Sequence, residues 1–257
     1  MALMFRVGLT RDFLMPDGSF AFGDIGLSLL EQAPGVKYEF LPEDTRELSA
    51  EQVRDYDALL VLAPRVTAAT LADAGRLTVL ARFGVGYDTV DVDACTRSGV
   101  LLTITPDGVR RPVATAVITL LLALSHRLVE KDRITREGRW AEKAACMGIG
   151  LTGRVLGIVG LGNIGREVAR LARPFDLRIL AADPYVTREQ AAAAGAELVQ
   201  LETLLRTADF VSVNCALTAE TRHLIDAERL ALMKPTAFLI NTARGPVVDQ
   251  RALTEAL

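Results

Sequence analysis

A glycine-rich turn after an apolar run constrains the fold of this chain more than any other feature. The apolar run Val155–Val159 leads into Gly160-Leu-Gly162-Asn-Ile-Gly165. This spacing is typical of a strand-to-helix turn that holds a pyrophosphate. Gly160 allows the tight turn, Gly162 leaves room for phosphates beside the backbone, and Gly165 lets the helix pack closely on the strand. The N–H groups at the helix start would bind the anion.

An acidic residue stands where the second strand of such a unit should end. A second apolar run, Leu177–Ala182, is followed by Asp183 and a proline. A carboxylate about twenty residues past the glycines accepts the ribose hydroxyls of NAD and repels the 2′-phosphate of NADP. The sequence therefore predicts an NAD-binding Rossmann domain. Arg188 lies close enough in sequence to leave NADP open as the lesser alternative.

The composition fits a soluble α/β protein. The chain has 257 residues, of which 50% are apolar and 24% charged, and its formal net charge is −3. This charge and the lack of a basic cluster argue against nucleic acid as a partner. The longest apolar stretch, Val113–Leu124, is too short to span a bilayer, so we expect a buried helix and no membrane anchor.

The cysteines and the N-terminus indicate a cytoplasmic location. Cys95, Cys146 and Cys215 are far apart in the sequence, which predicts neither a disulfide framework nor a metal site. The first ten residues run directly into a strand-like pattern, and no signal peptide is recognisable.

The first hundred residues alternate short apolar runs with helical patterns, and no internal repeat is visible. Such alternation predicts a mostly parallel sheet covered by helices, a flavodoxin-like domain without a phosphate loop. Ser49 and Gln52 have the spacing of a capping box at a helix start. Strands are expected at Phe5–Leu9, Tyr38–Leu41, Ala58–Leu62, Leu77–Ala81 and Val100–Ile104, and a longer helix at Phe22–Gln32.

A domain boundary is expected between Ile104 and Pro112. The segment Thr105–Gly108 has turn-forming residues, and a connector helix is expected from Pro112 to about Val129. The first domain would then span residues 1–104, and the NAD-binding domain residues 105–257. Together they would form two Rossmann-like domains with parallel sheets.

The pattern at the end of the chain predicts that the NAD-binding domain is incomplete at its C-terminus. Strands are expected at Phe210–Asn214 and Ala237–Asn241, followed by a last helix capped by Asp249. A Rossmann half-fold normally continues with further strands, and this helix stops at Leu257 without a polar tail. We therefore expect the natural protein to be longer.

Four segments carry a resemblance to a known family, and they occur in that family's order. They are Arg82-Phe-Gly84-Val-Gly86-Tyr-Asp88, the glycine turn with Asp183, Asn214-Cys-Ala216-Leu-Thr218-x-x-Thr221, and Asn241-Thr-Ala-Arg244-Gly245-Pro-Val-Val-Asp249. Together they resemble the D-isomer-specific 2-hydroxyacid dehydrogenases, which include phosphoglycerate, glycerate, D-lactate and formate dehydrogenases. The resemblance covers nearly the whole chain. It implies hydride transfer between NAD and C2 of a small D-2-hydroxy acid or its 2-keto form.

The substrate of such an enzyme carries a carboxylate, which needs hydrogen-bond donors. Backbone N–H groups at Val85 and Gly86, in a glycine-kinked loop, would form an anion-binding nest. Arg244 follows a buried strand, and its planar fork can hold the carboxylate and polarise the 2-oxygen. The resemblance favours this catalytic role over the structural alternative, an ion pair with Asp249.

The resemblance also implies further contacts to the cofactor. Asn163 and Ile164 would offer backbone N–H groups to the pyrophosphate. The residues expected to line the nicotinamide side are Cys215, Ala216, Thr221, Thr242 and Ala243.

The family exchanges the hydroxyl proton through a histidine paired with a glutamate, which the resemblance places beyond Leu257. Neither histidine of the chain takes this place. His126 lies on the connector helix, where we expect a core or hydrogen-bonded ring, and His223 lies in a segment that resembles a structural part of the family pattern.

Two other functions stay open on the same fold. One is an NAD(H)-sensing, corepressor-like binding protein, and the other is a dehydrogenase of formate or phosphite. A single arginine in Ala63-Pro64-Arg65 gives only weak support for a phosphorylated substrate such as phosphoglycerate. The family further implies a homodimer formed through residues Pro112–Trp140.

Overall fold

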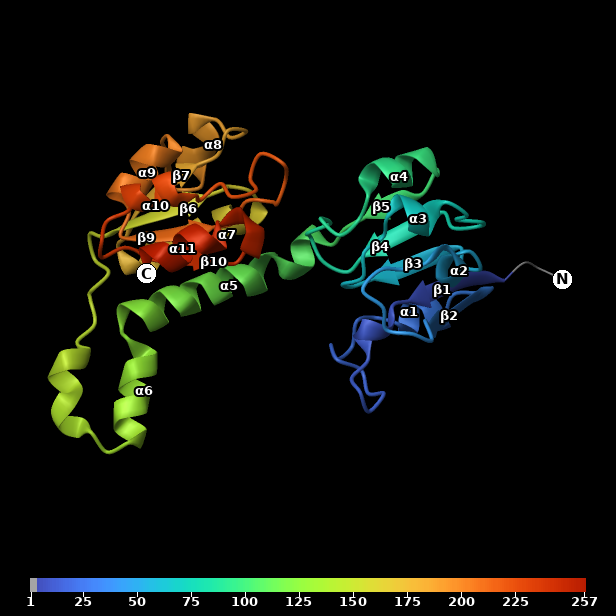
Figure 1. Ribbon diagram of the computed structural model, residues 1–257, viewed down its shortest axis with the longest axis horizontal. Coiled ribbons are helices and arrows are strands. Elements are labelled where there is room, and N and C mark those ends of the chain that lie inside the picture. The colour runs from blue at the N-terminus through green and yellow to red at the C-terminus, as the bar shows by residue number, and fades with distance from the viewer. Residues whose placement is uncertain (1–3) are drawn as a thin grey trace. The chain divides into compact units, whose positions relative to one another are not determined.

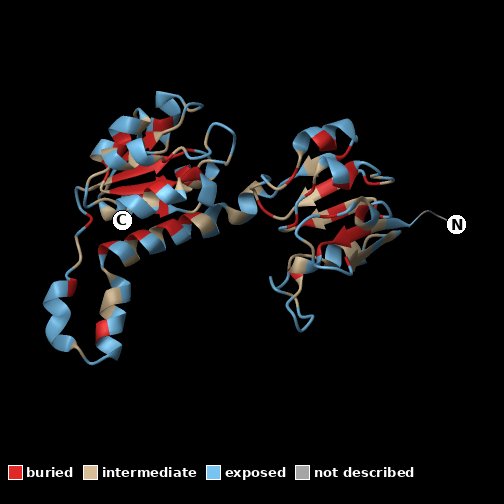
Figure 2. Cartoon of the chain, viewed as in Figure 1, coloured by how far each residue is buried: buried red, intermediate tan, exposed pale blue. Residues whose placement is uncertain are grey.

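The computed structural model describes residues 4–257 and divides into two compact units, Met1–Pro106 and Asp107–Leu257 (Figure 1). Each unit contains a five-stranded sheet in which every described strand pair is parallel. Buried residues concentrate on the strands and on the helix faces that cover them (Figure 2). The predicted α/β class with two parallel sheets is confirmed.

The first unit has the strand order β2-β1-β3-β4-β5, which is the flavodoxin-like order expected from the sequence. Each predicted strand is present, with ends that differ from the prediction by at most two residues. The strands are β1 Phe5–Leu9, β2 Val36–Phe40, β3 Ala58–Val61, β4 Val79–Arg82 and β5 Leu101–Thr103. The helices are η1 Arg11–Phe13, α1 Ser28–Glu31, α2 Ala50–Val53, α3 Ala68–Leu71 and α4 Val92–Arg97.

Local sequence determines where two of these helices begin. The predicted capping box at α2 is confirmed, because Gln52 N donates to Ser49 Oγ and Ser49 N donates to Gln52 Oε1. The predicted helix over Phe22–Gln32 is wrong in extent, since only Ser28–Glu31 is helical. Gly23 and Gly26 have φ values of 64° and 82°, a left-handed backbone that interrupts a right-handed helix.

The second unit has the strand order β10-β9-β6-β7-β8, with the glycine turn at the end of its central strand. Its strands are β6 Val155–Val159, β7 Arg178–Ala182, β8 Glu197–Leu198, β9 Phe210–Val213 and β10 Phe238–Asn241. Its helices are α5 Pro106–Ser125, α6 Leu128–Arg136, η2 Trp140–Cys146, α7 Asn163–Ala172, η3 Arg173–Phe175, α8 Arg188–Ala193, α9 Leu201–Thr207, α10 Ala227–Leu232, η4 Gly245–Val247 and α11 Gln250–Ala256.

The connector helix differs from its prediction at both ends. It begins at Pro106 and not near Pro112, so residues 106–108 are the first residues of the helix and not the expected turn. Proline suits the first position of a helix, where its missing N–H would have no partner. The helix ends at Ser125, and Arg127, with φ 50°, separates it from α6.

The same helix is not the buried helix that the apolar run predicted. Its 20 residues are long and apolar enough to cross a membrane by length and composition alone, and 22% of its most apolar window is buried. The buried positions follow the spacing of one helix face, which packs into the core of the second unit together with Leu156 and Ile158 of β6. They are Ala114, Val117, Leu121 and Ser125.

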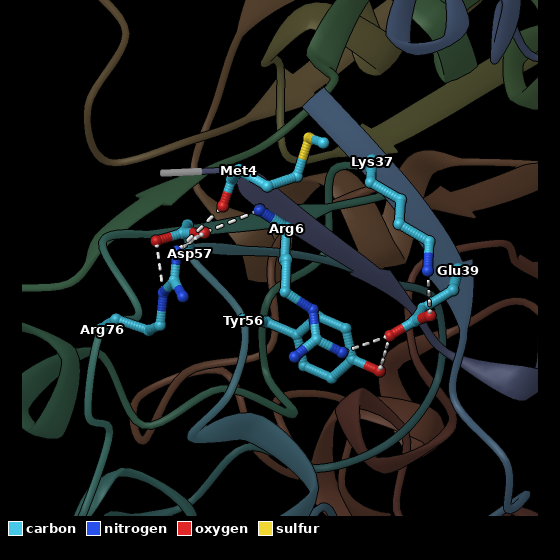
Figure 3. Close-up of polar contacts among 7 residues, drawn as sticks. All are labelled: Met4, Arg6, Lys37, Glu39, Tyr56, Asp57 and Arg76. Atoms are coloured by element: carbon cyan, nitrogen blue, oxygen red, sulfur yellow. Dashed lines mark hydrogen bonds and ion pairs between the residues drawn. The ribbon is translucent and has the colours of Figure 1, made fainter. Parts of the chain in front are cut away.

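An aspartate just before β3 binds the backbone N–H of Arg6 in β1 and the side chain of Arg76, which precedes β4 (Figure 3). Asp57 Oδ2 accepts from Arg6 N of β1 at 2.6 Å and from Arg76 Nη2 at 2.7 Å. Arg76 Nε donates to Oδ1 of the same carboxylate at 2.7 Å, and Nη2 also donates to Met4 O. Arg76 thereby binds the carboxylate with two parallel hydrogen bonds, the strong geometry for this pair.

The second unit repeats this arrangement at the equivalent place. Asp209 Oδ2, just before β9, accepts from Val155 N of β6 at 2.8 Å, and Lys234 Nζ donates to Oδ1 at 3.0 Å. In both units the aspartate N–H also donates to the carbonyl of that neighbouring strand residue. The two units therefore share a structural device that the sequence, which shows no repeat, did not reveal.

Asp57→Asn is expected to lower the free energy of unfolding by about 2 kcal/mol near neutral pH, because it weakens two charge-assisted hydrogen bonds of a part-exposed pair. Burial alone would raise the pKa of Asp57, but the hydrogen bonds from Arg76 and Arg6 outweigh it and hold this pKa below 3.8. A depressed carboxylate pKa stabilises the fold above the unfolded value and loses that contribution as pH falls through the folded value. Urea unfolding from about pH 7 to about pH 3 should therefore show the difference between the proteins shrinking below about pH 4; a constant difference would contradict this role.

Candidate cofactor and substrate sites

The three glycines of the turn have different surroundings. Gly160 has φ 91°, and a Cβ there would lie 2.7 Å from Cys215 N. A Cβ on Gly165 would collide with the carbonyl oxygen of Gly160. Gly162 has no atom within 4 Å of the place where a Cβ would be. Two glycines therefore allow close packing of the protein on itself, and the middle one faces open space.

Helix α7 begins directly after this open position. Its N-cap is Gly162, and no side chain caps it. The first N–H groups of a helix have no partner within the helix, and they lie at the positive end of its dipole. Val168, Ala169 and Ala172 are buried in the core and hold the helix on the sheet. The arrangement leaves the backbone N–H groups of Asn163 and the residues after it available to an anion.

Asp183 lies beside the glycine turn, directly after β7. Its Oδ2 accepts from Leu161 N at 2.8 Å, and its Oδ1 accepts from Tyr185 N at 2.9 Å. Each carboxylate oxygen has two lone pairs, so both can accept a further hydrogen bond from a hydroxyl. An open turn, an uncapped helix and a fixed carboxylate in this order fit the pyrophosphate and ribose of a dinucleotide.

The loop after β9 packs against the turn. Cys215 lies against Gly160, and burial, with a smaller contribution from the charge of Asp183, raises the pKa of its thiol. Thr221 Oγ1 donates to Ala216 O at 2.6 Å, so this hydroxyl fixes the shape of the loop. The structure thus brings Cys215 to the turn and uses the Thr221 side chain within the loop.

The arginine segment follows β10, the neighbour of β9. Asn241 closes it into a turn, because its side chain donates to Arg244 O at 2.9 Å and accepts from Ala243 N at 3.0 Å. Arg244 Nη1 donates to Ala243 O at 2.8 Å. Thr242 Oγ1 donates to Asn214 Oδ1 at 3.5 Å, which joins this turn to the loop after β9. Asn214 begins one of the four segments that carry the resemblance, but its contact with Thr242 was not expected from the sequence.

The alternative ion pair between Arg244 and Asp249 is wrong. Asp249 instead caps α11, where it accepts from Ala252 N, and it faces His223 Nδ1 at 3.7 Å. The Ala252 hydrogen bond is the largest cause that lowers the pKa of Asp249. The expectation for His126 is also wrong, since this residue is exposed and its ring has no hydrogen bond within residues 4–257.

The glycine-kinked loop of the first unit follows β4. Gly84 has φ 137°, its N–H donates to Thr105 Oγ1 at 2.8 Å, and its carbonyl accepts from Thr105 N at 2.9 Å. The next N–H groups, at Val85 and Gly86, have no acceptor among the described residues. Two adjacent unpaired N–H groups in a fixed loop are suited to bind an anion.

Comparisons with known proteins show to which family a chain with this arrangement belongs. Residues 118–257 match the model of the D-isomer specific 2-hydroxyacid dehydrogenase NAD binding domain. The chain is 43% identical over 240 residues to the glyoxylate reductase of Thermococcus onnurineus, covering 90% of this chain and 72% of that protein. The chain belongs to the D-isomer specific 2-hydroxyacid dehydrogenase family.

Solved structures of this family agree with the fold. The D-lactate dehydrogenase of Aquifex aeolicus, complexed with NAD and lactic acid, has a TM-score of 0.84 at 28% identity, covering 97% of this chain and 72% of that one. A glyoxylate reductase from Paecilomyes thermophila has a TM-score of 0.83 at 31% identity, covering 100% of this chain and 78% of that one.

The D-2-hydroxyacid dehydrogenase resemblance seen in the sequence is therefore confirmed, and so is NAD as the cofactor. The protein is an NAD-dependent oxidoreductase that acts on hydroxy or keto acids. The relatives named above are oxidoreductases, and the sensing protein and the formate or phosphite enzyme gain no support from them. Among the described residues, no group of three or more His, Cys, Asp or Glu side chains could hold a metal ion.

Proposed function

We propose that the protein reduces glyoxylate, or a 2-keto acid of similar size, with NADH. The observation that carries the proposal is the open position at Gly162 in front of an uncapped α7, with the Asp183 carboxylate hydrogen-bonded to the same turn. We choose glyoxylate as the substrate because the chain is 43% identical to the glyoxylate reductase of Thermococcus onnurineus.

The two domains divide the work in this proposal. Residues 105–257 bind NAD, with the pyrophosphate on the N–H groups of Asn163 and Ile164 and the adenosine ribose on Asp183. Residues 1–104 bind the substrate carboxylate through the N–H groups of Val85 and Gly86, which have no acceptor among the described residues.

Arg244 is the catalytic residue in this proposal. When bound, NADH would supply the hydride for C2 of the keto acid, and a general acid would supply the proton for the 2-oxygen; we assign that acid to no residue among 4–257. The guanidinium of Arg244 orients the substrate and stabilises the negative charge that develops on the 2-oxygen. The turn closed by Asn241 holds the Arg244 backbone at the end of β10. The nicotinamide side is lined by Cys215, Ala216, Thr221, Thr242 and Ala243.

Thiol labelling tests the cofactor site without relying on turnover. Cys215 is half-buried beside the glycine turn, whereas Cys95 and Cys146 are buried and serve as internal controls. Saturating NADH is expected to slow maleimide labelling of Cys215 by about tenfold or more, because only the cofactor-free fraction reacts. Mass spectrometry of the labelled peptides measures this rate. Unchanged labelling of Cys215, while NADH fluorescence shows binding, would place the cofactor elsewhere.

We also propose that the protein is a cytoplasmic homodimer. Helix α6 and η2 extend away from the sheet of the second unit (Figure 1), and large apolar side chains are exposed on and around them. Light scattering should give twice the mass of one chain, and Trp140→Asp combined with Met147→Asp should give the monomer; a monomeric wild-type protein would contradict the proposal. The exposed residues are Leu120, Leu124, Leu128, Val129, Trp140 and Met147.

A further inference from the structure

We propose that Arg166 is a further cofactor-binding residue, whose guanidinium pairs with the pyrophosphate of NAD at the glycine turn. The proposal rests on the proposed function, in which that turn holds the cofactor. It concerns a side chain that neither the glycine motif nor the strand-end acid predicts.

The side chain of Arg166 folds back toward the start of its helix. Arg166 is the fourth residue of α7, and helix side chains lean toward the N-terminus. Its Nε donates to Leu161 O at 3.0 Å, between the first two glycines of the turn. Its backbone N donates to Gly162 O at 2.9 Å. The guanidinium is therefore anchored to the turn by one nitrogen.

No carboxylate neutralises this guanidinium among residues 4–257. Glu167, the adjacent acid, is bound to Arg111 at 2.9 Å and to Arg170 at 2.8 Å. Asp183 accepts backbone N–H groups on both of its oxygens. With Nε on Leu161 O, the two terminal nitrogens of Arg166 keep their donors for a ligand.

A cation at the turn would strengthen its binding of a pyrophosphate. The helix dipole supplies only about half a positive charge, whereas the two phosphates carry about two negative charges. The first helical residue, Asn163, is exposed and neutral. An arginine held at the turn presents a planar fork that matches phosphate oxygens. Arg166 is the side chain that the geometry assigns to this charge.

The test compares ligands that differ in their phosphates. Binding of ADP and of adenosine is measured by displacement of NADH fluorescence from the wild-type protein and from Arg166→Gln. The variant should bind ADP about 10- to 100-fold more weakly, the size of one or two charge-assisted hydrogen bonds, and should bind adenosine unchanged. Arg166→Lys keeps the positive charge but lacks the planar guanidinium with its paired N–H donors, so it should recover part of the ADP affinity.

Arg170→Gln is the matched control, because Arg170 lies one turn further along the same helix and pairs with Glu167. It should bind both ligands as the wild type does. Unchanged ADP affinity in Arg166→Gln would overturn the proposal, and so would an equal loss for ADP and adenosine, which would indicate a change in the shape of the turn. Failure of the wild-type protein to bind NADH would instead contradict the proposed function.

Discussion

Replacement of Arg244 by glutamine is expected to lower kcat/KM for a 2-keto acid by about 10³-fold, because the neutral amide cannot stabilise the charge that develops on the 2-oxygen. Glutamine is polar and keeps the three side-chain carbons that arginine has next to the backbone, and Asn241 closes the turn at Arg244. The fold should therefore persist. The dissociation constant for NADH should change by less than about threefold, since the lost interaction is made with substrate.

Arg251→Gln is the control for this loss. Arg251 is 89% exposed and pairs with Glu255 of its own helix, so the change should leave kcat/KM unaffected. Steady-state kinetics with glyoxylate and a NADH fluorescence titration measure the two quantities. If Arg244→Gln keeps kcat/KM within about tenfold of the wild type, the assigned transition-state contact does not exist.

Substitutions at two glycines of the turn should separate its role in cofactor binding from its role in packing helix α7. Gly162→Val should raise the dissociation constant for NADH by about 100-fold with little loss of stability, because its φ of −74° suits valine and no atom lies within 4 Å of the place of its Cβ. Gly165→Ala should lower the free energy of unfolding by about 3 kcal/mol, since its Cβ collides with the carbonyl of Gly160. Urea unfolding and NADH titration of both variants provide the comparison.

Opposite results would contradict this division of roles. A Gly162→Val protein that binds NADH normally would show that no phosphate approaches this position. A Gly165→Ala protein as stable as the wild type would show that α7 can move away from β6 without cost.

The strands and the capping box at Ser49 were predictable because they depend on local pattern. Ser49 and Gln52 are three residues apart, and their reciprocal hydrogen bonds follow from that spacing. The prediction of a helix over Phe22–Gln32 was wrong because the spacing of apolar residues does not reveal the left-handed backbone at Gly23 and Gly26. The predicted start of the connector helix was wrong because Pro106 was interpreted as a turn residue, although proline is also common at the first position of a helix.

The candidate site was predictable as motifs but not as contacts. The glycine spacing predicts which residue leaves open space and which packs closely. The bonds from Leu161 N to Asp183 and from Thr242 to Asn214 join strands that are neighbours only in the folded sheet. The sequence itself offered the signal against an ion pair of Arg244 with Asp249, because Asp249 was also predicted to cap a helix.

In the proposed function, the protein reduces a small 2-keto acid with NADH held at the glycine turn. Loss of NADH absorbance with glyoxylate, measured side by side for the wild type and Gly162→Val, tests it most directly. The wild-type protein should oxidise NADH when glyoxylate is added, and at low NADH concentration the rate of Gly162→Val should be about 100-fold lower. Equal rates for the two proteins, or no binding of NADH by the wild type, would contradict it.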